Sequence, residues 1–192
     1  HCVETAAEAA SVTTLWFYEA SACAGDTSNP GTQVAGGTQL VFANYNVDAT
    51  LLQMNQSPPA GASYAPLNTS LIAANTPMVS LSHPRGDTSR WAEGVMSREA
   101  RDGHRPYDMY LLTFSRGMIE SGSSGSGAFT RTNGRLELAG ILSQGPLDGS
   151  CANPSIAFSG ARNSWLMRDR NSLLAWLAAS APRRARCASS SA

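Results

Sequence analysis

The sequence predicts an all-β protein that ends in one α-helix. Short segments rich in β-branched and aromatic residues recur along the chain, and each is bounded by Gly, Pro, Asn or Ser. Their spacing is typical of β-sandwiches and β-barrels. Only RNSLLAWLAAS at 170–180 places apolar residues at helical spacing, with Asp169 or Asn171 as the expected N-cap and Pro182 closing the helix.

The expected strands follow one another with turn residues between them. VTTLWFY at 12–18 is the first, and a loop rich in Gly, Ser, Asn and Pro follows at 21–37. The later strands are expected at 39–44, 49–54, 77–81, 90–96, 108–114, 127–130, 136–143 and 155–158. The Pro-, Gly-, Ala- and Ser-rich segment 58–65 is the expected linker, and Asn133-Gly134 is the residue pair typical of a tight hairpin turn.

Composition excludes several function classes. The 192 residues are 42% hydrophobic, and 14 Arg balance 14 acidic residues with no Lys, so no basic face predicts nucleic-acid binding. No apolar run approaches the roughly 20 residues of a membrane span. Cys2, Cys23, Cys151 and Cys187 form no C-x-x-C pair, which argues against a zinc cluster, and we expect no cofactor. A surface rich in Ser, Thr, Asn and Gly without Lys indicates a secreted, disulfide-forming protein.

The stretch ESGSSGSGAF at 120–129 allows two interpretations. It could be a flexible Gly/Ser linker, or a tight loop whose glycines let backbone amides crowd around the hydroxyl of Ser124. A hairpin follows it at once, which favours the loop. Ser124 is therefore the candidate nucleophile, and it needs a general base and a carboxylate that orients that base.

Histidine positions limit the possible triads. His1, His83 and His104 all precede Ser124, so the α/β-hydrolase order is excluded, and Ser126 breaks the G-x-S-x-G elbow. Two chain orders of the triad remain, namely His1, Asp48 and Ser124, or Asp48, His83 and Ser124. The second is the subtilisin-like order, but no helix is evident after Ser124 to support it.

The first order is supported by motifs along the chain. HC at 1–2, VDATLLQM at 47–54, LSHPRGD at 81–87, GMIESGSSGSGAF at 117–129 and ILSQGP at 141–146 together resemble the bacterial secreted lysyl endopeptidase group of the chymotrypsin-like serine proteases. This resemblance extends to Trp176 and implies two Greek-key six-stranded β-barrels of the trypsin-like type, the first incomplete here, with a C-terminal α-helix. We expect residues 1–66 to be the remainder of the N-terminal barrel, 67–168 the C-terminal barrel, 169–180 the helix and 181–192 a disordered tail.

The resemblance also implies the role of each site residue. Ser124 would attack the scissile carbonyl, His1 would carry its proton to the leaving amine, and Asp48 would hold the imidazole. The backbone amides of Gly122 and Ser124 would form the oxyanion hole. The substrate-binding strand would comprise Ser143, Gln144 and Gly145. His83 and His104 are interpreted as structural or surface residues.

Three features depart from the family pattern. Ile156 stands where the family is expected to have the acidic residue that binds a substrate lysine, so we expect Lys specificity to be lost. Ser123 precedes the nucleophile instead of Asp, so the trypsin-type ion pair with a new N-terminus cannot form. By resemblance, the cysteine partners and the first strands of the barrel lie upstream of His1, so this chain alone is expected to be inactive or nearly so.

The function expected from the whole sequence is a secreted, monomeric serine endopeptidase acting on polypeptides. Two alternatives stay open, a catalytically silent trypsin-like binding domain and a serine esterase that uses the same three residues.

Overall fold

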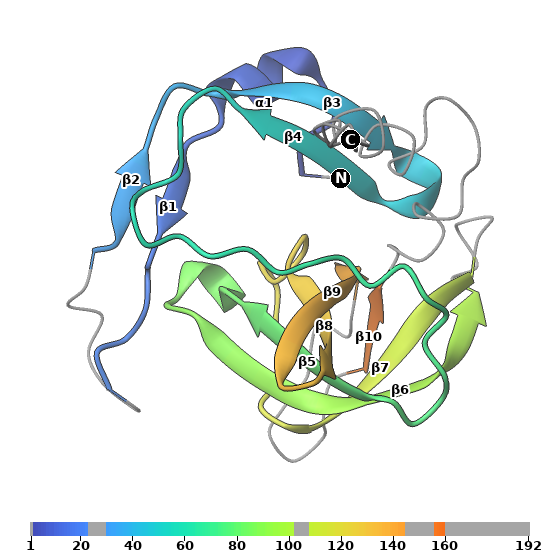
Figure 1. Ribbon diagram of the computed structural model, residues 1–192. Helices are drawn as coiled ribbons and strands as arrows, with labels where there is room; N and C mark the ends of the chain where they lie inside the picture. Colours follow the sequence, from blue (N-terminus) through green and yellow to red (C-terminus); the bar gives the residue numbers. More distant parts are fainter. Residues whose placement is uncertain (1, 23–29, 102–107, 145–155, 160–192) are drawn as a thin grey trace, which may run out of the picture.

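The second half of the chain forms a closed six-stranded β-barrel (Figure 1). The computed structural model describes residues 2–22, 30–101, 108–144 and 156–159. The barrel strands are β5 (Pro77–Ser82), β6 (Arg90–Arg101), β7 (Asp108–Arg116), β8 (Gly127–Thr132), β9 (Arg135–Gln144) and β10 (Ile156–Ser159). Their order around the barrel is β10-β7-β6-β5-β8-β9, and pairing of β9 with β10 closes it.

This order puts the Gly/Ser loop in a crossover connection. Every pairing in the barrel is antiparallel. However, β8 pairs with β5 and β9 rather than with β7, so the chain leaving β7 must cross one end of the barrel before β8 begins. A crossover at a barrel end presents its turn residues to the neighbouring part of the molecule, and this one carries the predicted nucleophile.

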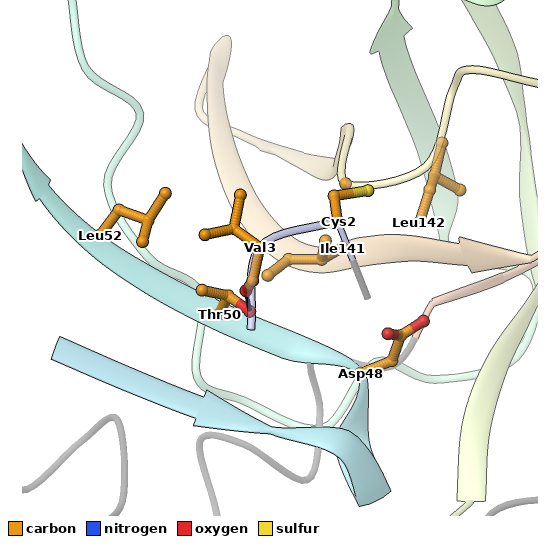
Figure 2. Close-up of a pocket in the computed structure, with 8 residues that line it drawn as sticks. Cys2, Val3, Asp48, Thr50, Leu52, Ile141 and Leu142 are labelled. Carbon is orange, nitrogen blue, oxygen red and sulfur yellow. Dashed lines mark hydrogen bonds between the residues drawn. The ribbon is translucent and has the colours of Figure 1, made fainter. Parts of the chain in front are cut away.

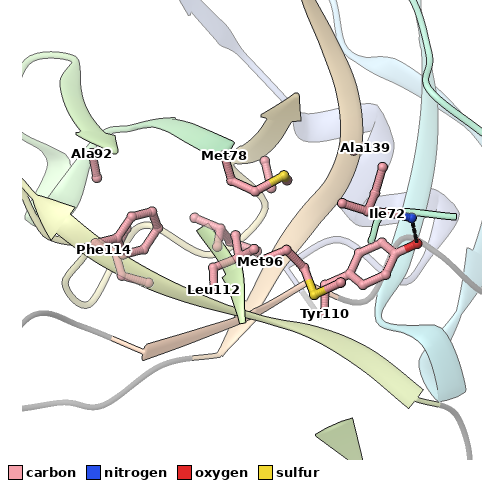
Figure 3. Packing of buried hydrophobic residues seen from close by; sticks show 11 residues of the cluster. Ile72, Met78, Ala92, Met96, Tyr110, Leu112, Phe114 and Ala139 are labelled. Carbon is pink, nitrogen blue, oxygen red and sulfur yellow. Dashed lines mark hydrogen bonds between the residues drawn. The ribbon is translucent and has the colours of Figure 1, made fainter. Parts of the chain in front are cut away.

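The barrel is filled by a continuous hydrophobic core (Figure 3). Tyr110 and Phe114 are the largest side chains buried almost completely. The buried Tyr110 hydroxyl has a hydrogen-bond partner, because it accepts a bond of 3.1 Å from the Ile72 amide. The other core residues are Met78, Ala92, Met96, Leu112, Ile119, Ala128, Ala139 and Leu142. Burial of this apolar surface fixes the barrel that supports the site.

The first half of the chain contributes smaller elements on one side of the barrel (Figure 1). Helix α1 (Ala6–Ser11) lies against β3 (Thr38–Asn44), which pairs with β4 (Ala49–Met54) as a two-stranded sheet. A second two-stranded sheet consists of β1 (Thr14–Trp16) and β2 (Thr32–Val34). Two one-turn 3₁₀ helices complete the described elements, η1 (Tyr45–Val47) and η2 (Pro84–Gly86).

The strand predictions are confirmed, with differences at the ends. Strand β4 has the predicted bounds, and the others overlap their predicted segments, although β6 continues to Arg101 and the first strand covers only Thr14–Trp16. The predicted hairpin is also confirmed, because Thr132 pairs with Arg135 and both Asn133 and Gly134 have positive φ, as a type I′ turn requires. The predicted helix at 169–180 lies outside the described residues.

Four described elements were not predicted, namely α1, β2 and the two 3₁₀ helices η1 and η2. The loop expected at 21–37 was wrong in its last part, because β2 (Thr32–Val34) pairs there with β1. Helix α1 was missed as well. Its signal is the capping box of Thr5 and Glu8, in which the Thr5 hydroxyl accepts from the Glu8 amide and the Glu8 carboxylate accepts from the Thr5 amide.

Candidate active site

Asp48 is a buried carboxylate held in a strained turn. It follows η1 and precedes β4, with φ of 49° and ψ of 48°, and its amide donates a 3.2 Å hydrogen bond to the Tyr45 carbonyl. Only 6% of the residue is exposed. A non-glycine residue in the left-handed region together with a buried charge costs free energy, so both features indicate a site rather than an ordinary turn.

The closed barrel supplies a hydrogen-bond donor to this carboxylate. The hydroxyl of Ser143, on β9, donates to Oδ2 of Asp48, and Ser143 is itself 4% exposed. This contact joins the first half of the chain to the barrel. A buried carboxylate is stabilised by such a donor, because a hydrogen bond to a charged group is stronger than one between neutral groups.

The segment that follows His1 lies beside Asp48 (Figure 2). The Thr50 hydroxyl donates a 2.9 Å hydrogen bond to the Val3 carbonyl, which fixes Cys2 and Val3 against β4. Cys2 is exposed and its thiol is free. Among the described residues, a cavity of about 170 Å³ is lined by Cys2, Val3, Asp48, Thr50, Leu52, Gly125, Ile141 and Leu142.

The crossover between β7 and β8 forms a hydrogen-bonded turn. Its amides at Ser123 and Ser126 donate to the carbonyls of Glu120 and Ser123 at 3.0 and 3.1 Å. On the barrel side, the Gly125 amide donates to the Leu142 carbonyl and the Leu142 amide donates to the Ser126 carbonyl, both at 2.8 Å. The interpretation of 120–129 as a tight loop is therefore confirmed, and a flexible linker is excluded.

The turn leaves the nucleophile candidate accessible. Ser124 is exposed, whereas Ser123 beside it is buried. Gly122 and Gly125 have φ of 89° and 81°, a conformation that favours glycine. Within the described chain, no hydrogen bond engages the Gly122 or Ser124 amide. An oxyanion hole uses backbone amides that are not engaged in other hydrogen bonds.

The structure brings together residues that are far apart in the sequence. Cys2, which follows His1, lines the same cavity as Asp48 and as Gly125, which follows Ser124. His1, Gly145 and His104 lie outside the described residues, as do the side chains of Gln144 and Ile156. The side chain of Ser143 contacts Asp48, a contact that sequence reasoning did not predict and for which the sequence carries no local signal.

His83 occupies a different position from the cavity residues. Its ring stacks on Tyr18 with ring centroids 5.9 Å apart, and its Nδ1 lies 3.0 Å from the Asp87 carbonyl oxygen. His83 does not line the Asp48 cavity. These contacts give it a structural place at the end of β5. Across the described residues, no group of three or more His, Cys, Asp or Glu side chains is arranged to hold a metal ion.

Comparison with known proteins identifies the family. Residues 1–159 match the family described as lysyl endopeptidase, C-terminal domain. The chain belongs to this family. The lysyl endopeptidase of Pseudomonas aeruginosa is 34% identical over 152 residues, which are 76% of this chain and 32% of the relative. The chain thus spans about a third of the length of the curated relative it matches.

Solved structures show the same fold at low identity. An HtrA-type AlgW protease with a tripeptide matches with a TM-score of 0.54 and 18% identity, covering 74% of this chain and 45% of that one. The AlgW protease with a decapeptide matches with a TM-score of 0.52 and 20% identity, covering 72% and 40%. The likeness to these HtrA-type proteases shows that the chain shares their fold.

Proposed function

We propose that this chain carries the catalytic centre of a secreted serine endopeptidase in which His1, Asp48 and Ser124 form the triad. The observation that carries the proposal is the shared cavity, which is lined by Asp48 itself and by the chain neighbours of the other two residues, Cys2 and Gly125. Family membership over residues 1–159 supports the same assignment.

The proposed reaction is acyl transfer to the serine hydroxyl. Ser124 Oγ attacks the carbonyl carbon of a peptide bond while His1 takes the hydroxyl proton, and Asp48 stabilises the imidazolium that forms. The amides of Gly122 and Ser124 donate hydrogen bonds to the oxyanion. His1 then gives the proton to the departing amine, and water attacks the acyl-enzyme to release the second product. The substrate is a polypeptide, and the protein acts as a monomer.

The test is covalent labelling of the full-length protein with a fluorophosphonate. Wild-type protein should be labelled, Ser124→Ala should not, and the matched control Ser126→Ala, two positions along the same loop, should still be labelled. Absence of labelling in the wild type would favour a silent binding domain. Casein degradation by the unlabelled wild-type enzyme separates an endopeptidase from an esterase.

Substrate specificity is proposed to differ from the family name. Ile156 stands where the family is expected to have an acidic residue, and an apolar side chain gives a substrate ammonium group no counter-charge. We expect cleavage after small or apolar residues. A peptide-library profile tests this, and dominance of lysine at the cleaved position would contradict it.

The isolated 192-residue chain is expected to hydrolyse peptides weakly or not at all. In the described residues, β1 to β4 form two separate two-stranded sheets, so the half that carries Asp48 has open edges, in contrast to the closed barrel. Ser124-dependent hydrolysis by this chain alone, at a rate comparable to that of the full-length protein, would refute the expectation.

Among the helices that the structure describes, none has the length and hydropathy of a membrane span.

A further inference from the structure

Ser123 makes a buried contact on the barrel side of the nucleophile loop. Its hydroxyl donates a 3.3 Å hydrogen bond to the hydroxyl of Ser82, the last residue of β5, and accepts one of 3.3 Å from the Glu120 amide. Ser82 and Ser123 are each 2% exposed. The loop is therefore attached to β5 through a pair of neutral hydroxyls that water does not reach.

The turn after β5 contacts the same loop through its backbone. The Arg85 amide, in η2, donates a 2.8 Å hydrogen bond to the Ser121 carbonyl. Gly122 lies so close to this turn that a Cβ placed there would be 2.9 Å from the Arg85 nitrogen. The side chains of Arg85 and Glu120 also pair at 3.1 Å, but the Arg85 side chain is 72% exposed, so that ion pair contributes little.

These contacts act on the peptide unit whose amide belongs to Gly122 and on the residue that follows it. The Arg85 amide binds the Ser121 carbonyl, which is the other half of that peptide unit, and the Ser82 hydroxyl binds the side chain of Ser123, the residue after Gly122. With its carbonyl and the following residue both held, rotation of this peptide is restricted. We propose that Ser82 is a positioning residue that keeps the Gly122 amide directed at the oxyanion, through its hydrogen bond with Ser123. The inference rests on the proposed endopeptidase function.

A neutral hydroxyl pair is a suitable device at this position. Ser123 carries no charge, whereas a buried carboxylate at position 123 would need an ionic partner. Its donor and acceptor capacities are both used inside the protein, by Ser82 and by the Glu120 amide. Removal of the Ser82 hydroxyl would leave the buried Ser123 proton without its acceptor, and the loop would gain conformations in which Gly122 no longer faces the oxyanion.

The experiment compares two Ser→Ala substitutions on one strand of the full-length protein. Ser82→Ala removes the contact with Ser123. Ser80→Ala is the matched control, because Ser80 lies two residues earlier on β5, is fully buried, and its hydroxyl has no hydrogen-bond partner among the described residues. Steady-state kinetics, inhibition by a peptide aldehyde that forms an oxyanion on the enzyme, and thermal unfolding are measured for each variant.

We expect Ser82→Ala to lower kcat about tenfold with KM nearly unchanged, and to weaken aldehyde inhibition by the same factor. Ser80→Ala should match the wild type in kcat, KM and aldehyde inhibition, and it should not lower the melting temperature. If Ser82→Ala fails to fold, Ser123→Ala breaks the same bond from the other side and should give the same pattern. A kcat within twofold of wild type in the folded variant would overturn the inference. An unreactive wild type would instead refute the proposed function itself.

Discussion

The Ser143→Ala substitution tests whether the two halves of the chain cooperate at Asp48. It removes the hydroxyl that donates to Asp48 Oδ2, while the small alanine side chain fits wherever serine did. Both residues are buried, so water cannot readily replace the lost donor. The Asp48 carboxylate would be less stabilised and less constrained in orientation.

The size of the effect follows from the kind of bond. A hydrogen bond to a charged group contributes about 1.5–3 kcal/mol to stability. At about 2 kcal/mol, the expected fall in melting temperature is about 4–8 °C for a domain of this size. If the whole loss reappears in the transition state, where Asp48 faces an imidazolium, kcat/KM falls by up to about 30-fold.

Two measurements check this prediction. Differential scanning calorimetry gives the change in melting temperature, and hydrolysis of a fluorogenic peptide by the full-length protein gives kcat/KM. The result that refutes the reasoning is a Ser143→Ala protein with wild-type melting temperature and wild-type kinetics. That outcome would mean that Asp48 is held by other groups alone and that the contact between the two halves contributes no energy.

Three further predictions concern single residues. Gly122→Ala should lower kcat about 100-fold. A φ of 89° and the closeness of the Arg85 backbone leave no room for a side chain, so the proposed oxyanion donor would be displaced. Steady-state kinetics of peptide hydrolysis measure the change in kcat. Ser80→Ala should raise the free energy of unfolding by about 1 kcal/mol in denaturant titration, because a buried hydroxyl without a partner disappears. The hydrogen bond from the Arg90 side chain, and after it the one from the Thr88 amide, lowers the pKa of Asp87 below its ordinary value of 3.8. The Asp87 carboxylate therefore stabilises the fold at pH values above 3.8, and this contribution is lost as the pH falls through the lowered pKa. Acid unfolding of Asp87→Asn should therefore show a weaker pH dependence in that range than the wild type, and identical curves would contradict it.

Strand positions were predictable because local signals agree with tertiary contacts. Strand β4 begins directly after the turn residue Asp48, and Asn133-Gly134 adopts the positive φ values that its turn requires. Helix α1 was missed although Thr5 and Glu8 form a recognisable capping box, because six residues are too few for a clear helical period. Strand β2 lies in a segment with the composition of a loop, and its extended conformation depends on its pairing with β1.

Sequence reasoning selected candidate site residues but not their contacts. Asp48 and Ser124 were chosen from chemistry, chain order and the family resemblance, and their catalytic roles stay predictions. The bonds of Ser143 to Asp48 and of Ser82 to Ser123 join residues 95 and 41 positions apart, and both involve serines whose local sequence resembles that of any polar strand end. Such contacts follow from the barrel topology, which no local pattern specifies.

The position of β9 explains how Asp48 and the loop that carries Ser124, the two proposed catalytic elements of the described chain, are kept in register. Leu142 binds the nucleophile loop through its backbone, on both sides of the turn at Gly125 and Ser126. The next residue, Ser143, binds Asp48 through its side chain. Consecutive residues of a strand point to opposite faces and are separated by a fixed rise, so a shift of β9 would displace the nucleophile loop and the carboxylate together. Strand β9 pairs with β8 from Arg135 to Ile141 and with β10 at Leu142 and Gln144, which opposes such a shift. The closed barrel therefore does more than support the loop, because it fixes the distance between two groups that belong to different halves of the chain.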